Sequence, residues 1–261
     1  MVLKRIDVGV VTMLPILAAV VTVVEQPALL VSVVMFFGVP SAYLAIRNPG
    51  ILKKSLVFAF VISVPLSLFV DTLAAIDKSW IVPQSLFPFR FFGLASVEVY
   101  LFSFLWVLHA ILFYEHFFDG GRRDDQISVR IRYLIYLSIA LVSYVIWGIL
   151  LDPAILSIRY FYALVSIVLL VIPLFLFLIR YPIFWRNFLL VQLYFFFLLL
   201  LFEMGALTAG QWTFPGTDYI GWISVFGLGF PLEELVFWMS LATASLLAYY
   251  EFFGDDLRKS V

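Results

Sequence analysis

The 261 residues carry a formal net charge of −1, so charge gives no reason to expect a nucleic-acid partner. There is no cysteine and there are only two histidines, which excludes disulfides, thiolate nucleophiles and iron–sulfur clusters and leaves almost no ligands for zinc. Hydrophobic residues make up 64% of the chain and charged residues 13%, whereas a soluble chain carries roughly 25% charged residues. This composition predicts an all-α protein that crosses the membrane several times.

Eight apolar runs are long enough to cross a bilayer, which takes about 20 helical residues. They fall at approximately 8–24, 28–46, 55–76, 94–114, 133–151, 158–179, 188–208 and 231–250. The first run is short, contains Pro15 and follows Lys4 and Arg5, so a signal peptide is an alternative interpretation. No small-x-small cleavage site follows it, and we therefore expect it to be the first membrane helix.

The basic residues of the loops predict the orientation of an eight-helix bundle. Thirteen of them fall on the side of the N-terminus, and these are Lys4, Arg5, Arg47, Lys53, Lys54, Arg122, Arg123, Arg130, Arg132, Arg180, Arg186, Arg258 and Lys259. Three fall on the other side, and these are Lys78, Arg90 and Arg159. Because cytoplasmic loops are enriched in Lys and Arg, we expect a cell-membrane protein with both termini in the cytoplasm.

Landmark residues of the first half recur in the second half at two offsets. At 132 residues, the pairs are Asp71 with Glu203, Ala74 with Ala206, and Trp80 with Trp212. At 136 residues, they are Gly93 with Gly229, Glu98 with Glu234, and Tyr114-Glu115 with Tyr250-Glu251. One small insertion between Trp212 and Gly229 accounts for the difference. We predict two four-helix repeats, 1–118 and 133–261, that run parallel about an axis along the membrane normal and are joined by a cytoplasmic linker at 119–132.

Five acidic residues lie within the predicted spans, in the half of the bilayer away from the termini. Asp71 and Glu203 are near the end of the third helix of each repeat, and Glu98, Glu233 and Glu234 are near the start of the fourth. A short connection joins these helices, so we expect two acidic clusters, one in each repeat. Clustered carboxylates in a low dielectric cannot all ionise, and a neutral carboxylic acid is what protonation of an apolar substrate requires. The residue pattern leaves open which glutamate is that acid.

The stretch from Gly229 to Trp238 opens the last span with Pro231 and two adjacent glutamates. A proline and acids in the first turn of a helix also serve as simple capping residues. The pair resembles that of the intramembrane CAAX-processing proteases, but Trp238 stands where those enzymes have an arginine. No histidine follows His116, so their ligand set is missing.

A proton-coupled transporter is a more serious alternative, because internal repeats and acids within the membrane are typical of transporters. Against it, the acids lie off-centre, and no pair of broken helices appears at matching positions in the two halves. No glycine-rich dinucleotide fingerprint follows a strand-like segment, so we expect no nucleotide cofactor. Because cysteine is absent and there are only two histidines, we also expect no metal.

The second half resembles the lycopene cyclase domain of the integral-membrane, two-component type, which occurs as paired small subunits or as one fused chain. The residues that carry the resemblance are Glu203, Ala206, Trp212, Gly229, Pro231, Glu233, Glu234 and Phe237. The first half matches with Asp71, Ala74, Trp80 and Glu98, but it has Ala95-Ser-Val-Glu98 in place of Pro-x-Glu-Glu. Glu203 also replaces the usual Asp. These departures are compatible with catalysis by the second half alone, with a changed end-group specificity, or with a lost activity.

The resemblance implies a carotenoid end-group cyclase, an intramolecular lyase or isomerase that closes a ring without redox change. A neutral Glu233 or Glu234 would protonate the terminal double bond of lycopene or a longer acyclic carotenoid, and a carboxylate would remove a proton after ring closure. The candidate catalytic residues are Glu233, Glu234, Glu203, Glu98 and Asp71, and the candidate substrate-binding residues are Trp80, Trp212, Phe237, Trp238 and Pro231.

Aromatic side chains can stabilise a carbocation with their ring faces, or they can simply belong to the aromatic belt of the membrane interface, which is the better interpretation of Trp222. The implied partners are an acyclic carotenoid, membrane lipid, and a second copy of the chain or a second family subunit. The alternative function is a non-catalytic protein of the same fold that binds or transports a carotenoid or lipid.

Overall fold

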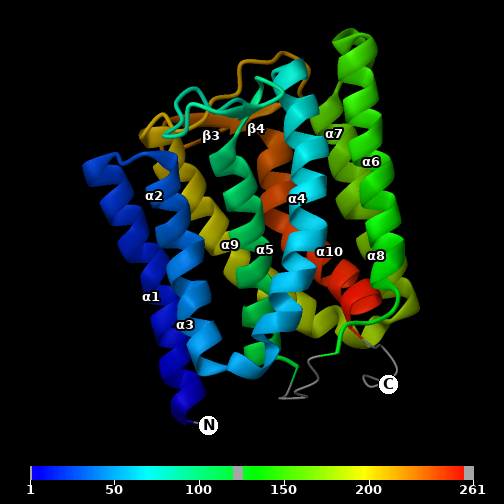
Figure 1. Ribbon diagram of the computed structural model, residues 1–261. Helices are drawn as coiled ribbons and strands as arrows, with labels where there is room; N and C mark the ends of the chain where they lie inside the picture. Colours follow the sequence, from blue (N-terminus) through cyan, green and yellow to red (C-terminus); the bar gives the residue numbers. More distant parts are fainter. Residues whose placement is uncertain (1, 120–125, 256–261) are drawn as a thin grey trace.

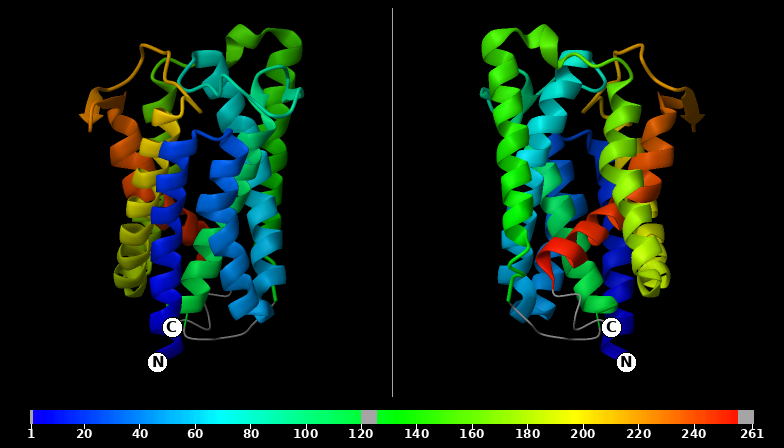
Figure 2. Two further views of the ribbon diagram at one scale, coloured as in Figure 1. Left: turned by 90° about the vertical axis from the view of Figure 1, so that its left-hand side faces the viewer. Right: turned by 90° about the vertical axis from the view of Figure 1, so that its right-hand side faces the viewer.

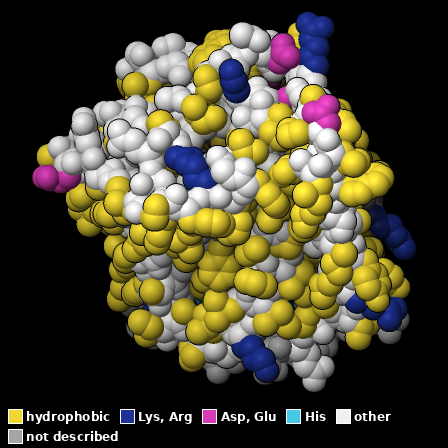
Figure 3. Space-filling view, turned by 45° about the horizontal axis from the view of Figure 1, so that its top comes forward, with side chains coloured by type: hydrophobic (Ala, Val, Ile, Leu, Met, Phe, Trp, Pro, Cys, Tyr) yellow, Lys and Arg dark blue, Asp and Glu magenta, His cyan; other side chains and the backbone are white. Residues whose placement is uncertain are grey.

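A computed structural model describes residues 2–119 and 126–255 as a bundle of long helices with two small β-hairpins at one end (Figure 1). Eight helical segments are long and apolar enough to cross a membrane, and these are Lys4–Glu25, Leu29–Arg47, Pro49–Asp77, Val97–Phe117, Ile131–Leu151, Phe161–Arg180, Pro182–Thr208 and Glu234–Gly254. The prediction of eight spans is therefore confirmed. Hydrophobic side chains cover most of the flank seen in Figure 3, as expected of a surface that faces lipid.

The order of elements is similar before and after the connection at 118–130, although only the second half has a 3-10 turn after its first helix and a divided fourth helix. The first half contains α1 (Val2–Glu25), α2 (Leu29–Val33), η1 (Val34–Gly38), α3 (Val39–Arg47), η2 (Pro49–Ile51), α4 (Leu52–Asp77), β1 (Arg90–Phe91), β2 (Ala95–Ser96) and α5 (Val97–Phe117). The second half contains α6 (Ile131–Leu151), η3 (Pro153–Leu156), α7 (Phe161–Ser166), η4 (Ile167–Val171), α8 (Ile172–Arg180), η5 (Pro182–Phe184), α9 (Trp185–Thr208), β3 (Trp222–Val225), β4 (Leu228–Pro231), η6 (Glu234–Met239), α10 (Ser240–Tyr249) and η7 (Tyr250–Gly254).

The second span of each half contains a proline inside the membrane. Pro40 follows the π turn η1, and Pro173 follows the π turn η4. A proline has no N–H to donate and its ring crowds the carbonyl four residues earlier, so it disturbs the regular hydrogen bonding of an α-helix. A π turn accommodates one additional residue and lets the helix continue. Both spans therefore cross the bundle in spite of their prolines.

The start of α1 and the end of η7 lie at the same end of the bundle, and both hairpins lie at the other, which we call the hairpin end (Figures 1 and 2). Nine of the thirteen basic residues assigned to the side of the N-terminus are described, and the elements that carry them place them away from the hairpin end. The other four, Arg122, Arg123, Arg258 and Lys259, lie outside the described residues, as does the stretch 120–125 of the predicted linker.

The two halves interlock rather than stand side by side. The first helix of each half packs against the third helix of the other, α1 on α9 and α6 on α4, and α10 contacts α5. An aromatic centre formed by Phe36, Phe37, Phe102 and Phe202 joins η1 and α5 of the first half to α9 of the second, with ring centroids 5.1 to 5.3 Å apart. Such offset and edge contacts add to the stabilisation that comes from burial.

Two crossed hydrogen bonds join α5 to η7 at the end opposite the hairpins. The Tyr114 hydroxyl donates to Glu251, with Oη and Oε1 2.5 Å apart, and the Tyr250 hydroxyl donates to Glu115. The ammonium group of Lys54 lies 3.8 Å from the Glu115 carboxylate. All five side chains are buried, so each half supplies hydrogen-bonding groups that the other half needs.

The β-hairpins were not predicted, and they correct where the fourth helices begin. The predicted spans start at 94 and 231. α5 begins at Val97, and in the second half the chain is helical from Leu232, so each fourth helix starts directly after its hairpin. The β3–β4 turn is Phe226-Gly227, with φ of 52° and 83°, and the β1–β2 turn contains Phe92-Gly93, with φ of 53° and 74°. Positive φ favours glycine at such turns. By position in the hairpin, Gly93 therefore corresponds to Gly227 and not to the predicted Gly229.

Candidate functional site

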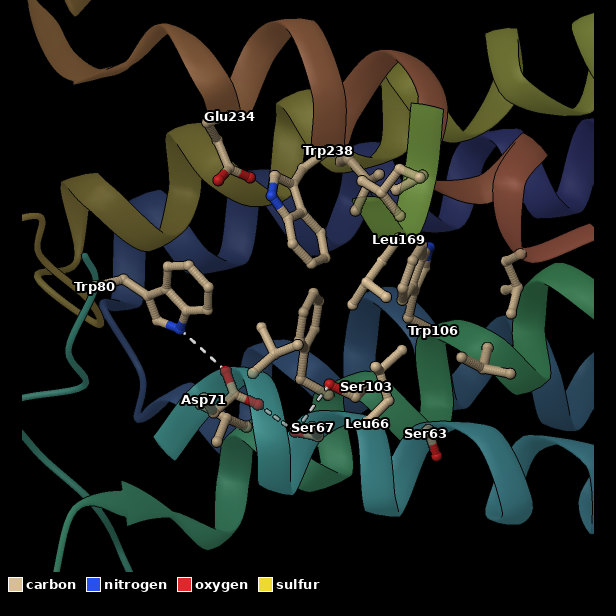
Figure 4. A pocket seen from close by; sticks show the side chains of 18 of the residues that line it. Ser63, Leu66, Ser67, Asp71, Trp80, Ser103, Trp106, Leu169, Glu234 and Trp238 are labelled. Atoms are coloured by element: carbon tan, nitrogen blue, oxygen red, sulfur yellow. Dashed lines mark hydrogen bonds between the residues drawn. The ribbon is translucent and has the colours of Figure 1, made fainter. Parts of the chain in front are cut away.

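An apolar pocket of about 160 Å³ lies inside the bundle, between α4, α5, η4, α9 and the last span. It extends from Asp71 to Ile62 along α4, and from Glu234 to Tyr249 along η6 and α10. Three carboxylates interrupt its largely apolar lining, and these are Asp71, Glu203 and Glu234. Figure 4 shows Asp71 and Glu234 on elements from opposite halves of the chain.

Asp71 is held by two hydrogen-bond donors. Ser67, one helical turn earlier on α4, donates to one carboxylate oxygen, and the Trp80 indole N–H donates to the other at 3.0 Å (Figure 4). Ser103 of α5 donates in turn to the Ser67 hydroxyl, with the two oxygens 3.3 Å apart. Donors of this kind favour the ionised form of a carboxyl group.

Glu203 has the equivalent arrangement on α9 with a single donor, the Trp212 indole N–H at 3.1 Å. The local fold explains the spacing of nine residues between acid and tryptophan in both halves. After α4 the chain turns at Lys78 (φ 60°), and after α9 it turns at Gly210 (φ 61°). The next amides, of Ser79 and Gln211, donate back to the carbonyls of Ala74 and Ala206. This helix end reverses the chain and brings the following tryptophan back to the acid.

Glu234 differs from both, because no group within the described residues donates a hydrogen bond to its carboxylate. It is the first residue of η6, and Figure 4 shows it pointing to the pocket on the side of Trp80. Trp238, one turn later, also lines the pocket, and its buried indole N–H is likewise unpartnered within residues 2–119 and 126–255. Of the three carboxyl groups that line the pocket, Glu234 is therefore the one without a hydrogen-bond donor in the described part of the chain.

Aromatic rings surround the space between Asp71 and Glu234. The Trp80 and Trp238 rings lie 6.2 Å apart at an interplanar angle of 70°, and Tyr162 lies 4.8 Å from Trp80 and 6.1 Å from Trp238. Trp212 packs on Phe202 at 5.0 Å. Ring faces carry partial negative charge, so this arrangement can accommodate a cationic group without an ion pair.

Glu98 and Glu233 lie outside the pocket lining, although both were predicted to be catalytic candidates. The Glu98 carboxylate accepts hydrogen bonds from the backbone N–H of Leu86 at 2.6 Å and from the Ser85 hydroxyl at 2.7 Å. The Glu233 carboxylate accepts one from the backbone N–H of Ile220 at 2.6 Å. Both residues are buried and hold loops of the hairpin end. The structure thus gathers Asp71, Glu203 and Glu234 in one pocket in place of the two predicted clusters.

The loop after α4, which Glu98 holds, and the loop after α9, which Glu233 holds, together form a roof over the pocket. The roof joins the two halves through reciprocal backbone hydrogen bonds of 3.0 Å between Ile81 and Thr213. Tyr219 fastens it, because its hydroxyl donates to the Ser79 carbonyl at 2.9 Å. Burial raises the pKa of Tyr219 to about 12, so the hydroxyl stays protonated near neutral pH. Trp80, Trp212 and Phe214 all belong to the roof and line the pocket below it.

The other predicted substrate-binding residues divide between the lining and its surroundings. Trp80, Trp212 and Trp238 line the pocket, whereas Pro231, at the end of β4, and Phe237 lie outside it. The lining also includes residues that were not predicted, and these are Ser67, Ser103, Trp106 and Tyr162. Ser67 precedes Asp71 by one helical turn, which is a usable sequence signal. No sequence signal identified the other three.

One group of described carboxylates has a spacing suited to a cation, and it lies away from the pocket at the opposite end of the bundle. Oxygens of Glu115, Asp119 and Asp255 lie within 4.8 Å of one another. The Lys54 ammonium is 2.7 Å from Asp255 and already supplies a positive charge there. This group therefore gives no reason to place a metal ion at the pocket.

Comparison with protein-family models, with curated proteins and with solved structures gave no match. The resemblance to the lycopene cyclase domain accordingly stays a prediction from the residues that carry it.

Proposed function

We propose that this chain is a carotenoid end-group cyclase of the cell membrane, built from two four-helix repeats, 1–118 and 133–261, around one pocket. The observation that supports it most is the pocket itself, in which carboxyl groups and indole rings from both halves meet in an apolar cavity inside the bundle. Ionisable groups in a membrane interior are costly and usually functional. The resemblance described above independently indicates the same chemistry.

Glu234 is the proton donor in this proposal. A carboxyl group in an apolar cavity without hydrogen-bond donors is held in its neutral form, because burying the unpaired anion costs more. Its proton passes to the terminal carbon–carbon double bond of an acyclic carotenoid and leaves a tertiary carbocation. The electrons of the neighbouring double bond then form the new carbon–carbon bond of a six-membered ring, and the positive charge moves into that ring.

Asp71 is the proton acceptor. Its carboxylate has two donors, Ser67 and Trp80, so it is prepared to remain an anion until the cation forms. Removal of a proton next to the cationic carbon creates a new double bond, and the choice of carbon decides the ring type. One proton enters and one leaves, so no oxidant or reductant is required.

The aromatic rings stabilise the cation between these two steps. Trp80, Tyr162 and Trp238 surround the space between donor and acceptor, where cation–π attraction acts without competing water. A cavity of about 160 Å³ suits one end of a long hydrocarbon rather than its whole length. The remainder of the carotenoid would therefore extend out of the pocket into lipid.

Orientation forms part of the same proposal, with the hairpin end facing away from the cytoplasm and both termini inside, following the distribution of basic residues. The chain contains no cysteine, so single cysteines can be labelled without background. We expect a membrane-impermeant maleimide to label Thr217→Cys, in the exposed roof, in intact cells. Arg186→Cys, exposed at the start of α9, should be labelled only after permeabilisation. The reverse pattern contradicts the orientation.

The activity is tested by pigment analysis in a host that accumulates lycopene. We expect cyclic carotenoids with the wild-type chain and none with Glu234→Gln, which keeps size but cannot donate the proton. Glu25→Gln, exposed at the end of α1, is the matched control and should behave as wild type. Absence of any cyclic product, with or without a second family subunit, contradicts the proposal. Retention of unchanged pigment by the purified protein would then favour the alternative, a carotenoid-binding or transport protein.

A further inference from the structure

The last span is the only fourth helix of the described halves that is interrupted where it passes the pocket. In the first half, α5 runs as one α-helix from Val97 to Phe117. In the second half, the π segment η6 carries Glu234 and Trp238 and gives way at Ser240 to α10. A π turn inside an α-helix has an identifiable cause in most structures and is frequent at functional sites.

The side chain of Gln192 reaches across from α9 and enters the last span where η6 gives way to α10. Its amide nitrogen donates to the Met239 carbonyl at 2.6 Å, and its amide oxygen accepts from the Ala244 N–H at 2.8 Å. Met239 and Ala244 are five residues apart, the separation that a π-type hydrogen bond would close directly. The amide of Gln192 replaces that bond by two of its own and is itself buried.

The first half has no side-chain amide at the equivalent position of its third helix. Counted back from the equivalent acids Asp71 and Glu203, Gln192 corresponds to Phe60, which is exposed and has no hydrogen-bonding side chain. A side-chain amide within a membrane bundle is costly unless both its donor and its acceptor are used. Gln192 uses its donor and its acceptor on the backbone of the last span, so both of its hydrogen bonds stabilise the break between η6 and α10.

The break sets the direction in which the preceding residues point. A π turn holds one residue more than an α turn, and one residue corresponds to about 100° of rotation around a helix. Closing the break would turn η6 relative to α10 by about one such step and would carry Glu234 and Trp238 away from their present directions. The anchored end, α10, contributes Ala242 and Leu246 to the same pocket.

We propose that Gln192 is a positioning residue whose inserted amide holds the break that directs Glu234 and Trp238 into the pocket. The inference rests on the proposed function in so far as Glu234 is the proton donor. The direction in which the Glu234 side chain points can be measured without a carotenoid.

The test measures how fast Glu234 reacts with dicyclohexylcarbodiimide, an apolar reagent that modifies neutral carboxyl groups, with mass spectrometry of the modified peptide. Gln192→Leu keeps the size and removes both hydrogen bonds. We expect its rate of modification at Glu234 to fall by about tenfold, because the two hydrogen bonds that hold the break are lost. Gln192→Glu in its neutral form can again donate to Met239 and accept from Ala244. At mildly acidic pH it should return the rate to near that of wild type at the same pH.

Gln211→Leu is the matched control, since Gln211 is also a buried amide of the second half and donates to the Pro27 carbonyl and to Ser32. It should lower the melting temperature without changing the modification of Glu234. The proposal is overturned if Gln192→Leu reacts as wild type, if both leucine variants slow the reaction equally, or if Gln192→Glu restores nothing. Wild-type chain that is modified at Glu234 but forms no cyclic product contradicts the proposed function alone. Wild-type chain that is not modified there contradicts both.

Discussion

The two halves of the chain place the same framework around the pocket and differ in one reactive group. Each has an acid near the end of a helix, a tryptophan folded back onto it, and a glutamate that holds a roof loop. The residue after that glutamate is Val99 in the first half and Glu234 in the second, and both line the pocket. The comparison teaches that the two adjacent glutamates have different roles: Glu233 holds the roof, and Glu234 faces the cavity.

Removing this difference should have the largest effect. Glu234→Val makes the second half like the first, and we expect the rate of cyclisation in isolated membranes to fall by about 10²- to 10⁴-fold, the usual contribution of a general acid. Val99→Glu added to that variant offers the carboxyl group from the other half and should recover part of the lost rate. An active Glu234→Val variant would show that the proton comes from elsewhere.

Asp71 and Glu203 occupy equivalent positions, and their unequal hydrogen bonding predicts unequal effects. Asp71 has two donors and Glu203 has one, so Asp71 is better prepared as the anionic base. We expect Asp71→Asn to lower the rate by about 10²-fold and Glu203→Gln to lower it less. Asp71→Asn should also change the proportions of the ring isomers, which chromatography of the products measures. Equal losses with unchanged isomers would contradict the assignment.

Glu98 and Glu233 should matter for stability rather than for the chemical step. Removing a buried acceptor leaves its donor unsatisfied, which costs about 1 to 3 kcal/mol for each donor. Glu98 accepts from two residues and Glu233 from one. Glu98→Ala should therefore lower the melting temperature in detergent more than Glu233→Ala does. A Glu233→Ala variant that folds as stably as wild type and yet makes no product would return Glu233 to the list of catalytic residues.

Tyr219 gives the smallest predicted effect, because only neutral hydrogen bonds of the roof are at stake: its hydroxyl donates to the Ser79 carbonyl and accepts from the Gly216 N–H. Tyr219→Phe should cost about 1 kcal/mol of unfolding free energy. The pKa of Tyr219 is raised to about 12, so this contribution is complete below pH 10 and is lost only as pH rises toward 12. Melting curves of both chains at pH 6 and pH 9 should show the same difference. A difference that vanishes between these values would contradict the assigned hydrogen bond.

The sequence was sufficient for the eight spans, because long apolar runs leave few alternatives in a bilayer. It also drew attention to Asp71, Glu203 and Glu234, since an acid within an apolar run is conspicuous. It did not reveal the hairpins. The stretch after Gly229 is apolar in a strand and in a helix alike, and periodicity does not separate the two in short runs.

The predicted pairing of Glu98 with Glu234 was wrong because the hairpins, which set the register, were not foreseen. The predicted offset matched Glu98 with Glu234, but the hairpins and roof contacts place Glu98 where Glu233 lies. A shift of one residue on a helix changes the side that faces the pocket. The insertion of Gln192 into the last span was also invisible, because it depends on two helices that lie 47 residues apart at their point of contact.

The crossed bonds between Tyr114 and Glu251 and between Tyr250 and Glu115 have a consequence for synthesis of the chain. A ribosome makes the first four helices long before Tyr250 and Glu251 leave the exit tunnel. Until then, the Tyr114 hydroxyl lacks its acceptor and Glu115 lacks its donor, because both partners lie at the end of the last span. A nonsense mutation that removes only the final dozen residues would leave seven helices intact in sequence and still present the cell with an unfinished protein to degrade.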